Sequence, residues 1–290
     1  MRCIRKLSIL VVAIPILGIL GWGGWLAFFR RDALEIGSAY AAKTVCSNVF
    51  MANRDVDSIL RTDLLALGYP IFHLMKIDVS AADHRVDAGY FGLFAERHAE
   101  FIEGRGCTNV LNDASWNRPA PLYPSPAKDP DTLWPVGEKV QLSHNARLQA
   151  AINDPVLQGP GMRAIVVVHD GRIVAETYGA GFTASTPLQG WSMTKTVTAA
   201  LVGLAIKDGK LSLDQKHLFS QWAGDARSEI SVADLMAMSG GLEWNEDQGL
   251  PSDAGRMEYL VKDVAAFARD RPLVAPREPN FITRPARQSC

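Results

Sequence analysis

Two short apolar runs in the second half of the chain have the β-branched character of strands. They cover residues 163–169 and 172–178 and are separated only by Asp170 and Gly171. An Asp-Gly pair readily adopts the left-handed backbone of a two-residue hairpin turn. The pattern therefore predicts an antiparallel β-hairpin over these residues.

A second pattern, with the period of a helix, begins at Ser192. Asp208 and Gly209 end it, as is typical of a helix C-terminus. The apolar positions between them recur at helical spacing, at Val197, Ala200, Leu201, Leu204 and Ala205. We expect a mostly apolar, buried helix that opens at Ser192.

The longest apolar run lies near the N-terminus, over residues 7–29, and contains no charge. It is long enough to cross a bilayer, whereas buried core helices of this kind have about 10–14 residues. A cleavable signal is the competing interpretation, but its apolar segment normally has about 7–15 residues followed by a small-residue cleavage site. Basic residues flank the run on both sides, which weakens charge as a guide to orientation. We predict a single-pass membrane anchor or an uncleaved signal in residues 1–31.

The overall charge gives no sign of a polyanionic partner. The chain has 30 basic and 31 acidic residues, with a formal net charge of −1. There is no basic stripe and no phosphate-cradling glycine loop, so a nucleic-acid partner is not predicted. The histidines are scattered, and no pair of cysteines or histidines has the spacing of metal ligands. We therefore predict no metal site and no cofactor.

Ser192 and Lys195 form a candidate nucleophile and general base. Residues three apart on a helix share one face, with their Cβ atoms about 5–6 Å apart. A serine hydroxyl is a weak nucleophile until an adjacent base takes its proton. A lysine can do so when it is partly neutral, a state that the positive end of a helix dipole and burial both favour. For so short a motif, the alternative is an ordinary solvated helix start.

The order of these motifs resembles a known family. The hairpin is followed by the Ser-x-x-Lys helix, then by Gly-Lys-Leu-Ser-Leu-Asp at 209–214 and by a helix with Met-Ser-Gly-Gly at 230–242. Over residues 145–275 the chain is similar to the serine β-lactamase and penicillin-binding-protein superfamily. The second motif resembles its class C-like branch, which includes esterases, D-amino-acid peptidases and 6-aminohexanoate-dimer hydrolases.

The resemblance implies a fold and a chemistry. The expected fold class is α/β, with an antiparallel sheet and a helical region as in β-lactamases and transpeptidases. The expected reaction is cleavage of an amide or ester through an acyl-enzyme on Ser192, with Lys195 as general base. Trp191 is a candidate substrate-binding residue, although an indole beside a helix is more often packing. Trp244, Asn245 and Asp247 have the same two interpretations.

A disulfide between Cys46 and Cys107 is the expected cysteine chemistry. Cys3 lies before the apolar run and Cys290 is the last residue, so these two are the pair within the body of the chain. Their surroundings, at 41–47 and 104–108, are similar to the membrane-proximal region of class C-like proteins. Such a bridge suits a compartment outside the cytosol. Two buried free thiols are the alternative.

The chain departs from the family pattern after residue 276. The superfamily completes its site with a tyrosine in a Tyr-x-Asn or Tyr-Ser motif and with a Lys/His-Thr-Gly strand, and neither motif is in this sequence. The only tyrosine after Lys195 is Tyr259, which lies on the apolar face of a predicted helix. The missing strand would carry an oxyanion donor, whose loss typically costs about 10²–10³ in rate. We therefore expect a fold that is incomplete at its C-terminal side and an impaired site.

The tail at residues 277–290 has no apolar periodicity. Codons taken from the last base of each residue and the first two bases of the next can encode Ala-Gly-Thr-Glu-Phe-His-Tyr-Ser-Ser-Gly-Thr-Thr-Ile-Leu. This sequence resembles the missing family segment, and the hypothesis is a frameshift near Pro276 that truncates a longer hydrolase. Resequencing the gene tests it.

The sequence as a whole predicts five segments. They are an anchor or uncleaved signal at 1–31, a membrane-proximal region with some core of its own at 32–116, a proline-rich linker at 117–136, a partial β-lactamase-related domain at 137–276 and an out-of-family tail at 277–290. The linker alternatively lies as an arm over the domain surface. We expect the C-terminal domain to be extracytoplasmic, in the periplasm. Three function classes follow: a serine hydrolase, a catalytically silent binding or scaffold protein, and an inactive gene fragment.

Overall fold

The computed structural model describes residues 31–111, 127–247 and 251–274. The predicted anchor segment at 7–29, the first half of the predicted linker and the tail at 277–290 lie outside these residues. Within the described residues, no helix combines the length and the hydrophobicity needed to cross a membrane.

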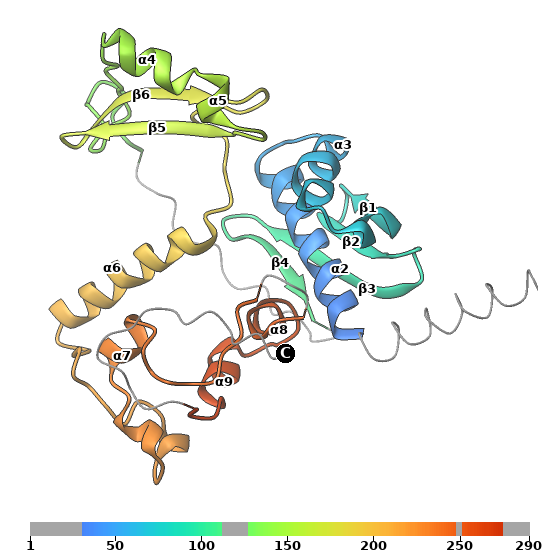
Figure 1. Ribbon diagram of the computed structural model, residues 1–290, viewed down its shortest axis with the longest axis vertical. Coiled ribbons are helices and arrows are strands. Elements are labelled where there is room, and N and C mark those ends of the chain that lie inside the picture. The colour runs from blue at the N-terminus through green and yellow to red at the C-terminus, as the bar shows by residue number, and fades with distance from the viewer. Residues whose placement is uncertain (1–30, 112–126, 248–250, 275–290) are drawn as a thin grey trace, which may run out of the picture.

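The N-terminal part is a long helix packed on a four-stranded sheet (Figure 1). Helix α2 covers Arg31–Cys46 and lies against the two middle strands. The strand order is β1-β2-β3-β4, and each strand is antiparallel to the next. The strands cover Met75–Ser80 for β1, Arg85–Tyr90 for β2, Phe94–Ile102 for β3 and Gly106–Val110 for β4. The short helix α3, Val56–Ile59, precedes the sheet and is capped by Asp55.

Small and β-branched side chains form the core between α2 and this sheet. Ala41 and Val45 of α2 and Val86 of β2 are completely buried. Small residues on the helix let the sheet approach closely, which gives the dense packing of a protein interior. A disulfide joins Cys46, at the end of α2, to Cys107 in β4, with 6.0 Å between the Cα atoms. The region therefore has a core of its own, as the sequence predicts.

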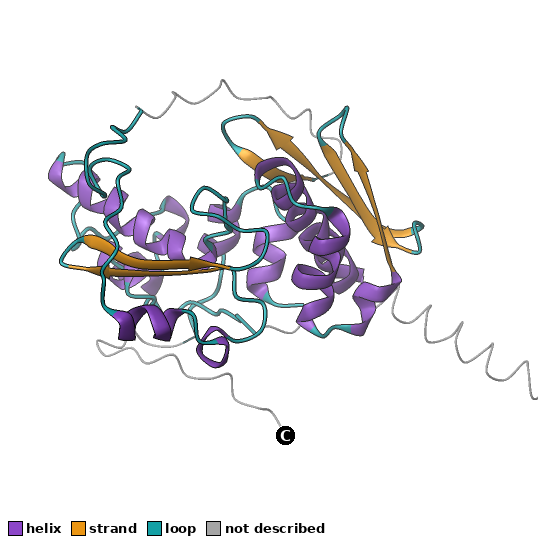
Figure 2. Cartoon of the chain, turned by 90° about the horizontal axis from the view of Figure 1, so that it is seen from above, coloured by secondary structure: helices purple, strands orange, loops and turns teal. Residues whose placement is uncertain are grey.

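The predicted hairpin is present as a second, separate sheet. Strands β5, Ala164–His169, and β6, Arg172–Tyr178, pair antiparallel. Asp170 and Gly171 have φ angles of 48° and 70°, which is the left-handed turn expected of an Asp-Gly pair. Helix α4, Ala146–Ile152, packs on β6, and α5, Pro155–Gln158, follows it. Figure 2 shows this hairpin well apart from the four-stranded sheet.

The described end of the predicted linker lies against the hairpin. The Arg172 side chain donates a hydrogen bond to the backbone carbonyl of Trp134. A little further along, the Ser143 amide donates to the Val174 carbonyl at 2.8 Å. The part of residues 127–136 around Trp134 thus contacts the hairpin.

Helix α6 covers Thr194–Lys207 and follows a short 3₁₀ turn at Trp191–Met193. The helix ends at Asp208 and Gly209 as predicted. The expectation that it is buried is wrong: none of its residues is buried, and Val197, Leu201 and Leu204 are each more than half exposed. The physical reason is that the described residues place no sheet or helix over its apolar face.

The C-terminal helices connect back to the N-terminal part. They are α7, Val232–Met236, α8, Asp253–Tyr259, and α9, Val264–Arg269. Tyr259 packs with Ile36 and Ala39 of α2 in a small buried cluster. Arg256 of α8 binds Asp32 of α2 at 2.6 Å. The first and last parts of the described chain therefore pack on each other through α2 and α8.

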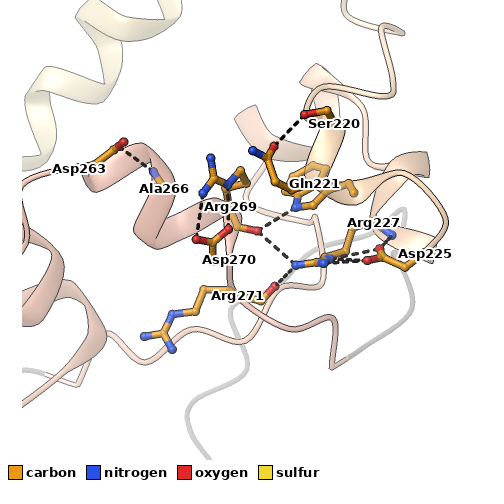
Figure 3. Close-up of polar contacts among 10 residues, drawn as sticks. Ser220, Gln221, Asp225, Arg227, Asp263, Ala266, Arg269, Asp270 and Arg271 are labelled. Atoms are coloured by element: carbon orange, nitrogen blue, oxygen red, sulfur yellow. Dashed lines mark hydrogen bonds and ion pairs between the residues drawn. The ribbon is translucent and has the colours of Figure 1, made fainter.

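A polar cluster fixes the segment that leads to α7 (Figure 3). The Arg227 guanidinium lies between the Asp225 carboxylate and the backbone carbonyls of Arg269 and Arg271. The buried Trp222 also donates its indole N–H to the Arg269 carbonyl, at 2.8 Å. These donors satisfy carbonyls at the C-terminal end of α9, which have no partner within the helix.

Candidate active site

Ser192 and Lys195 lie side by side at the start of α6. The Lys195 Nζ atom is 2.9 Å from the Ser192 Oγ atom and donates a hydrogen bond to it. Ser192 lies in the 3₁₀ turn and Lys195 in the first turn of the helix, which places both side chains on one face. The structure thus brings the two candidate catalytic residues together at the distance required for proton transfer.

The direction of this hydrogen bond matters for the chemistry. An ammonium group has three donors and no acceptor, so it donates to the hydroxyl. When the amine is neutral, its lone pair accepts the hydroxyl proton along the same 2.9 Å line, and the oxygen becomes nucleophilic. Both residues are exposed to solvent.

The turn that carries Ser192 has an unusual backbone. Trp191 has a φ angle of 42°, in the left-handed region that bulky residues rarely adopt. The Thr194 hydroxyl donates to the Trp191 carbonyl at 2.6 Å, and the Met193 amide donates to the Gly190 carbonyl at 2.9 Å. Outliers of this kind cluster at functional sites.

Trp191 extends from this turn toward the N-terminal helix. About half of its surface is exposed, and its ring stacks on Tyr40 of α2 with 6.0 Å between centroids and 22° between planes. Both interpretations of this residue therefore have support, because one side of the indole packs and the rest faces solvent beside the nucleophile.

The Glu258 carboxyl lies within electrostatic range of both Lys195 and Lys43. Local desolvation raises the pKa of the Glu258 carboxyl, and the positive charges of Lys43 and Lys195 act against this rise. Lys43 belongs to α2 and Glu258 to α8, so these two charges come from segments that are far apart in the sequence. Sequence reasoning missed Tyr40, Lys43 and Glu258, because no local motif indicates that α2 packs beside this turn.

The other aromatic and polar candidates have structural roles. Tyr259 is only 6% exposed, as expected for the apolar face of a helix, and burial raises its pKa. The Trp244 indole donates to Glu246, and its ring packs edge-on against Phe267. The Asn245 carbonyl accepts from the amide of Asp253 at the start of α8. The loop at 244–247 is therefore joined to the start of α8, whose N-cap is Ser252.

The hairpin sheet that precedes Ser192 in the sequence has two strands, β5 and β6, within the described part of the chain. In those same residues, no group of three or more histidine, cysteine, aspartate or glutamate side chains is arranged to hold a metal ion.

Residues 152–280 match the family model described as Beta-lactamase. This range begins at the end of α4 and includes the hairpin, Ser192 and Lys195. No curated protein matches the chain. Residues 152–280 therefore belong to the serine β-lactamase and penicillin-binding-protein superfamily.

Proposed function

We propose that this protein is a membrane-anchored serine hydrolase of the β-lactamase-related family that cleaves an amide or ester bond. The observation that carries the proposal is the 2.9 Å hydrogen bond between Lys195 and Ser192 within a β-lactamase-family domain. The preference for a short amide or ester over a β-lactam rests on the resemblance to the class C-like branch.

The proposed reaction has two steps. In the first, Lys195 takes the Ser192 proton while Oγ bonds to the carbonyl carbon of the substrate. The bond to the leaving nitrogen or oxygen then breaks, and the leaving group receives that proton. In the second, water attacks the acyl-enzyme and releases the acid, which restores the Ser192 hydroxyl. The backbone N–H of Ser192 supplies one oxyanion donor in this scheme.

The proposed setting is the periplasmic face of a membrane. The uncharged run at 7–29 supports an anchor. The Cys46–Cys107 disulfide supports an oxidising compartment, because such bridges are rare in the cytosol. Protease protection of the full chain in spheroplasts tests this orientation.

An acylating fluorophosphonate probe tests the catalytic proposal on the full-length chain. We expect labelling of the wild type that disappears in Ser192→Ala and persists in the matched control Ser212→Ala, an exposed serine beyond α6. Lys195→Met should slow labelling by about 10²–10⁴, the usual contribution of a general base. Labelling that survives Ser192→Ala, or no labelling of folded wild type, contradicts the proposal.

A second candidate function is a catalytically silent protein or an inactive fragment. The exposed apolar face of α6 favours it, because a buried nucleophile helix is what the sequence pattern predicts. We propose that a frameshift near Pro276 accounts for the impaired site. Sequencing the gene decides this: the frameshift fails if no downstream frame encodes Tyr-Ser-Ser followed by a Lys/His-Thr-Gly strand.

A further inference from the structure

We propose that helix α2 forms one wall of the nucleophile site and that Tyr40 is a positioning residue for Ser192. This inference rests on the proposed function. Its starting observation is the stacking of the Tyr40 ring on Trp191, the residue directly before the nucleophile. The N-terminal region is then part of the hydrolytic unit, and not only a spacer between a membrane and that unit.

The backbone at Trp191 needs support from outside its own segment. Its φ angle of 42° is unfavourable for a side chain as large as an indole, and such conformations persist only where the surroundings hold them. The contact with Tyr40 supplies that support on one side of the ring. The Trp191 carbonyl accepts hydrogen bonds from the hydroxyl and the amide of Thr194. A change of backbone conformation at Trp191 would therefore loosen the turn that holds Ser192 beside Lys195.

Tyr40 is itself firmly held. It packs against both buried clusters that line α2. Its ring lies 6.2 Å from that of Phe72 and 6.1 Å from that of Tyr259, in an edge-on contact with the latter. A side chain fixed by packing on several sides is a suitable support for a strained neighbour.

A second, independent contact joins the same two parts of the chain. Phe182 lies in the loop between β6 and Ser192, and the Arg54 guanidinium lies 4.9 Å from the centre of its ring. Arg163, at the foot of the hairpin, lies 5.7 Å from the same ring. Both arginines bind Asp63, at 2.8 Å and 2.6 Å. The N-terminal region therefore contacts the loop near its start, at Phe182, and at its end, at Trp191.

The rate of fluorophosphonate labelling of Ser192 tests this role. We expect Tyr40→Leu to slow labelling by about tenfold or more. Without the Tyr40 ring, the strained left-handed backbone at Trp191 can relax, and the active geometry must then be restored before Ser192 reacts. Tyr40→Phe keeps the ring and should restore the rate. Tyr69→Leu is the matched control, because Tyr69 also packs on Phe72, at 6.2 Å, and should leave the rate unchanged.

A double-mutant cycle separates positioning from general packing. Glycine adopts the left-handed region without strain, so Trp191→Gly removes the need for support from Tyr40. Adding Tyr40→Leu to Trp191→Gly should then change the labelling rate by less than about twofold. Equal effects of Tyr40→Leu in both backgrounds would overturn the positioning role.

Trp191 emission distinguishes failure of this inference from failure of the proposed function. The difference between wild type and Trp191→Phe isolates the signal of this indole, and Tyr40→Leu should shift that signal to the red as the ring becomes more exposed. Normal labelling of Tyr40→Leu overturns the inference and leaves the hydrolase in place. An emission shift with no labelling of folded wild type overturns the hydrolase, and the positioning role with it, while the contact itself stands.

Discussion

Helices α2 and α6 have similar lengths, 16 and 14 residues, but opposite environments. More than half of α2 is buried, whereas no residue of α6 is. The exposed helix has more large aliphatic side chains than the buried one, whose buried residues are mostly small. The comparison shows that an apolar helix face is buried only where another element of the fold packs against it.

The difference between the two helices extends to their surroundings. Helix α2 has a sheet on one side, α8 on another and a disulfide at its end. Helix α6 presents Val197, Leu201 and Leu204 to solvent. Contiguous exposed apolar patches mark interaction surfaces or aggregation sites. Four predictions test how far this contrast holds.

Loss of the disulfide should have the largest effect on stability. The bridge links residues 61 apart in the sequence, and closing a loop of this size stabilises by about 4 kcal/mol in the chain-entropy model. The paired change Cys46→Ser with Cys107→Ser should lower the free energy of unfolding by that order in a urea titration. Cys290→Ser is the control. Equal stability of the two variants would show that the disulfide does not stabilise the α2 region.

Truncating one side chain in each environment tests the contrast directly. Ile59 is completely buried in the α2 core, so Ile59→Ala should cost about 2–5 kcal/mol. Leu201 is 60% exposed, so Leu201→Ala should change stability by no more than about 0.5 kcal/mol. Chemical denaturation measures both. A large cost for Leu201→Ala would mean that α6 is covered in solution.

The link between the N-terminal region and the hairpin should weaken in acid. Burial alone would raise the pKa of Asp63, but hydrogen bonds from Arg54, Thr62 and Arg163 outweigh it and hold the pKa below its ordinary value of 3.8. The ionised carboxylate therefore stabilises the fold above about pH 4, and this contribution is lost as the pH falls through the lower, folded value.

Asp63→Asn isolates that contribution. The variant should be less stable than wild type by about 1–3 kcal/mol at neutral pH, because it leaves two arginines without their partner. The gap between the two unfolding midpoints should close as the pH falls below 3.8. A gap that stays constant with pH would assign the effect to packing. Asp83→Asn, in the exposed turn before β2, is the control.

The smallest effect on stability is expected for a charge on the exposed face of α6. Leu201→Lys should leave the unfolding midpoint within about 0.5 kcal/mol of wild type, because the side chain already faces solvent. The same change should reduce self-association, measured by light scattering as a function of concentration, because it interrupts the apolar patch. Unchanged self-association would mean that the protein associates through a surface other than the apolar face of α6.

Local sequence patterns predicted the elements well. The Asp170-Gly171 turn and the end of α6 at Asp208 depend on backbone preferences of a few adjacent residues. The Ser192–Lys195 contact also follows from helix geometry alone, since residues three apart share a face. Each of these features lies within a short window, where no distant partner is needed.

Contacts between distant segments were not predictable in the same way. Tyr40 and Trp191 are far apart in the sequence and meet because α2 packs beside the loop after β6. No motif around Tyr40 indicates this neighbour. The exposure of α6 was not predicted for a related reason. Hydrophobic periodicity identifies the apolar face of a helix but does not identify the element that covers that face.

The sequence by itself determined the candidate nucleophile and base, the hairpin, the β-lactamase-family ancestry and the candidate cysteine pair. These depend on spacing and on local backbone chemistry. The tertiary structure alone decided that α2 is buried and α6 exposed, and that Tyr40 stacks on Trp191, the residue before Ser192. The physical reason is that burial and ring stacking depend on contacts between segments that are distant in the sequence. Those contacts form only in the folded chain.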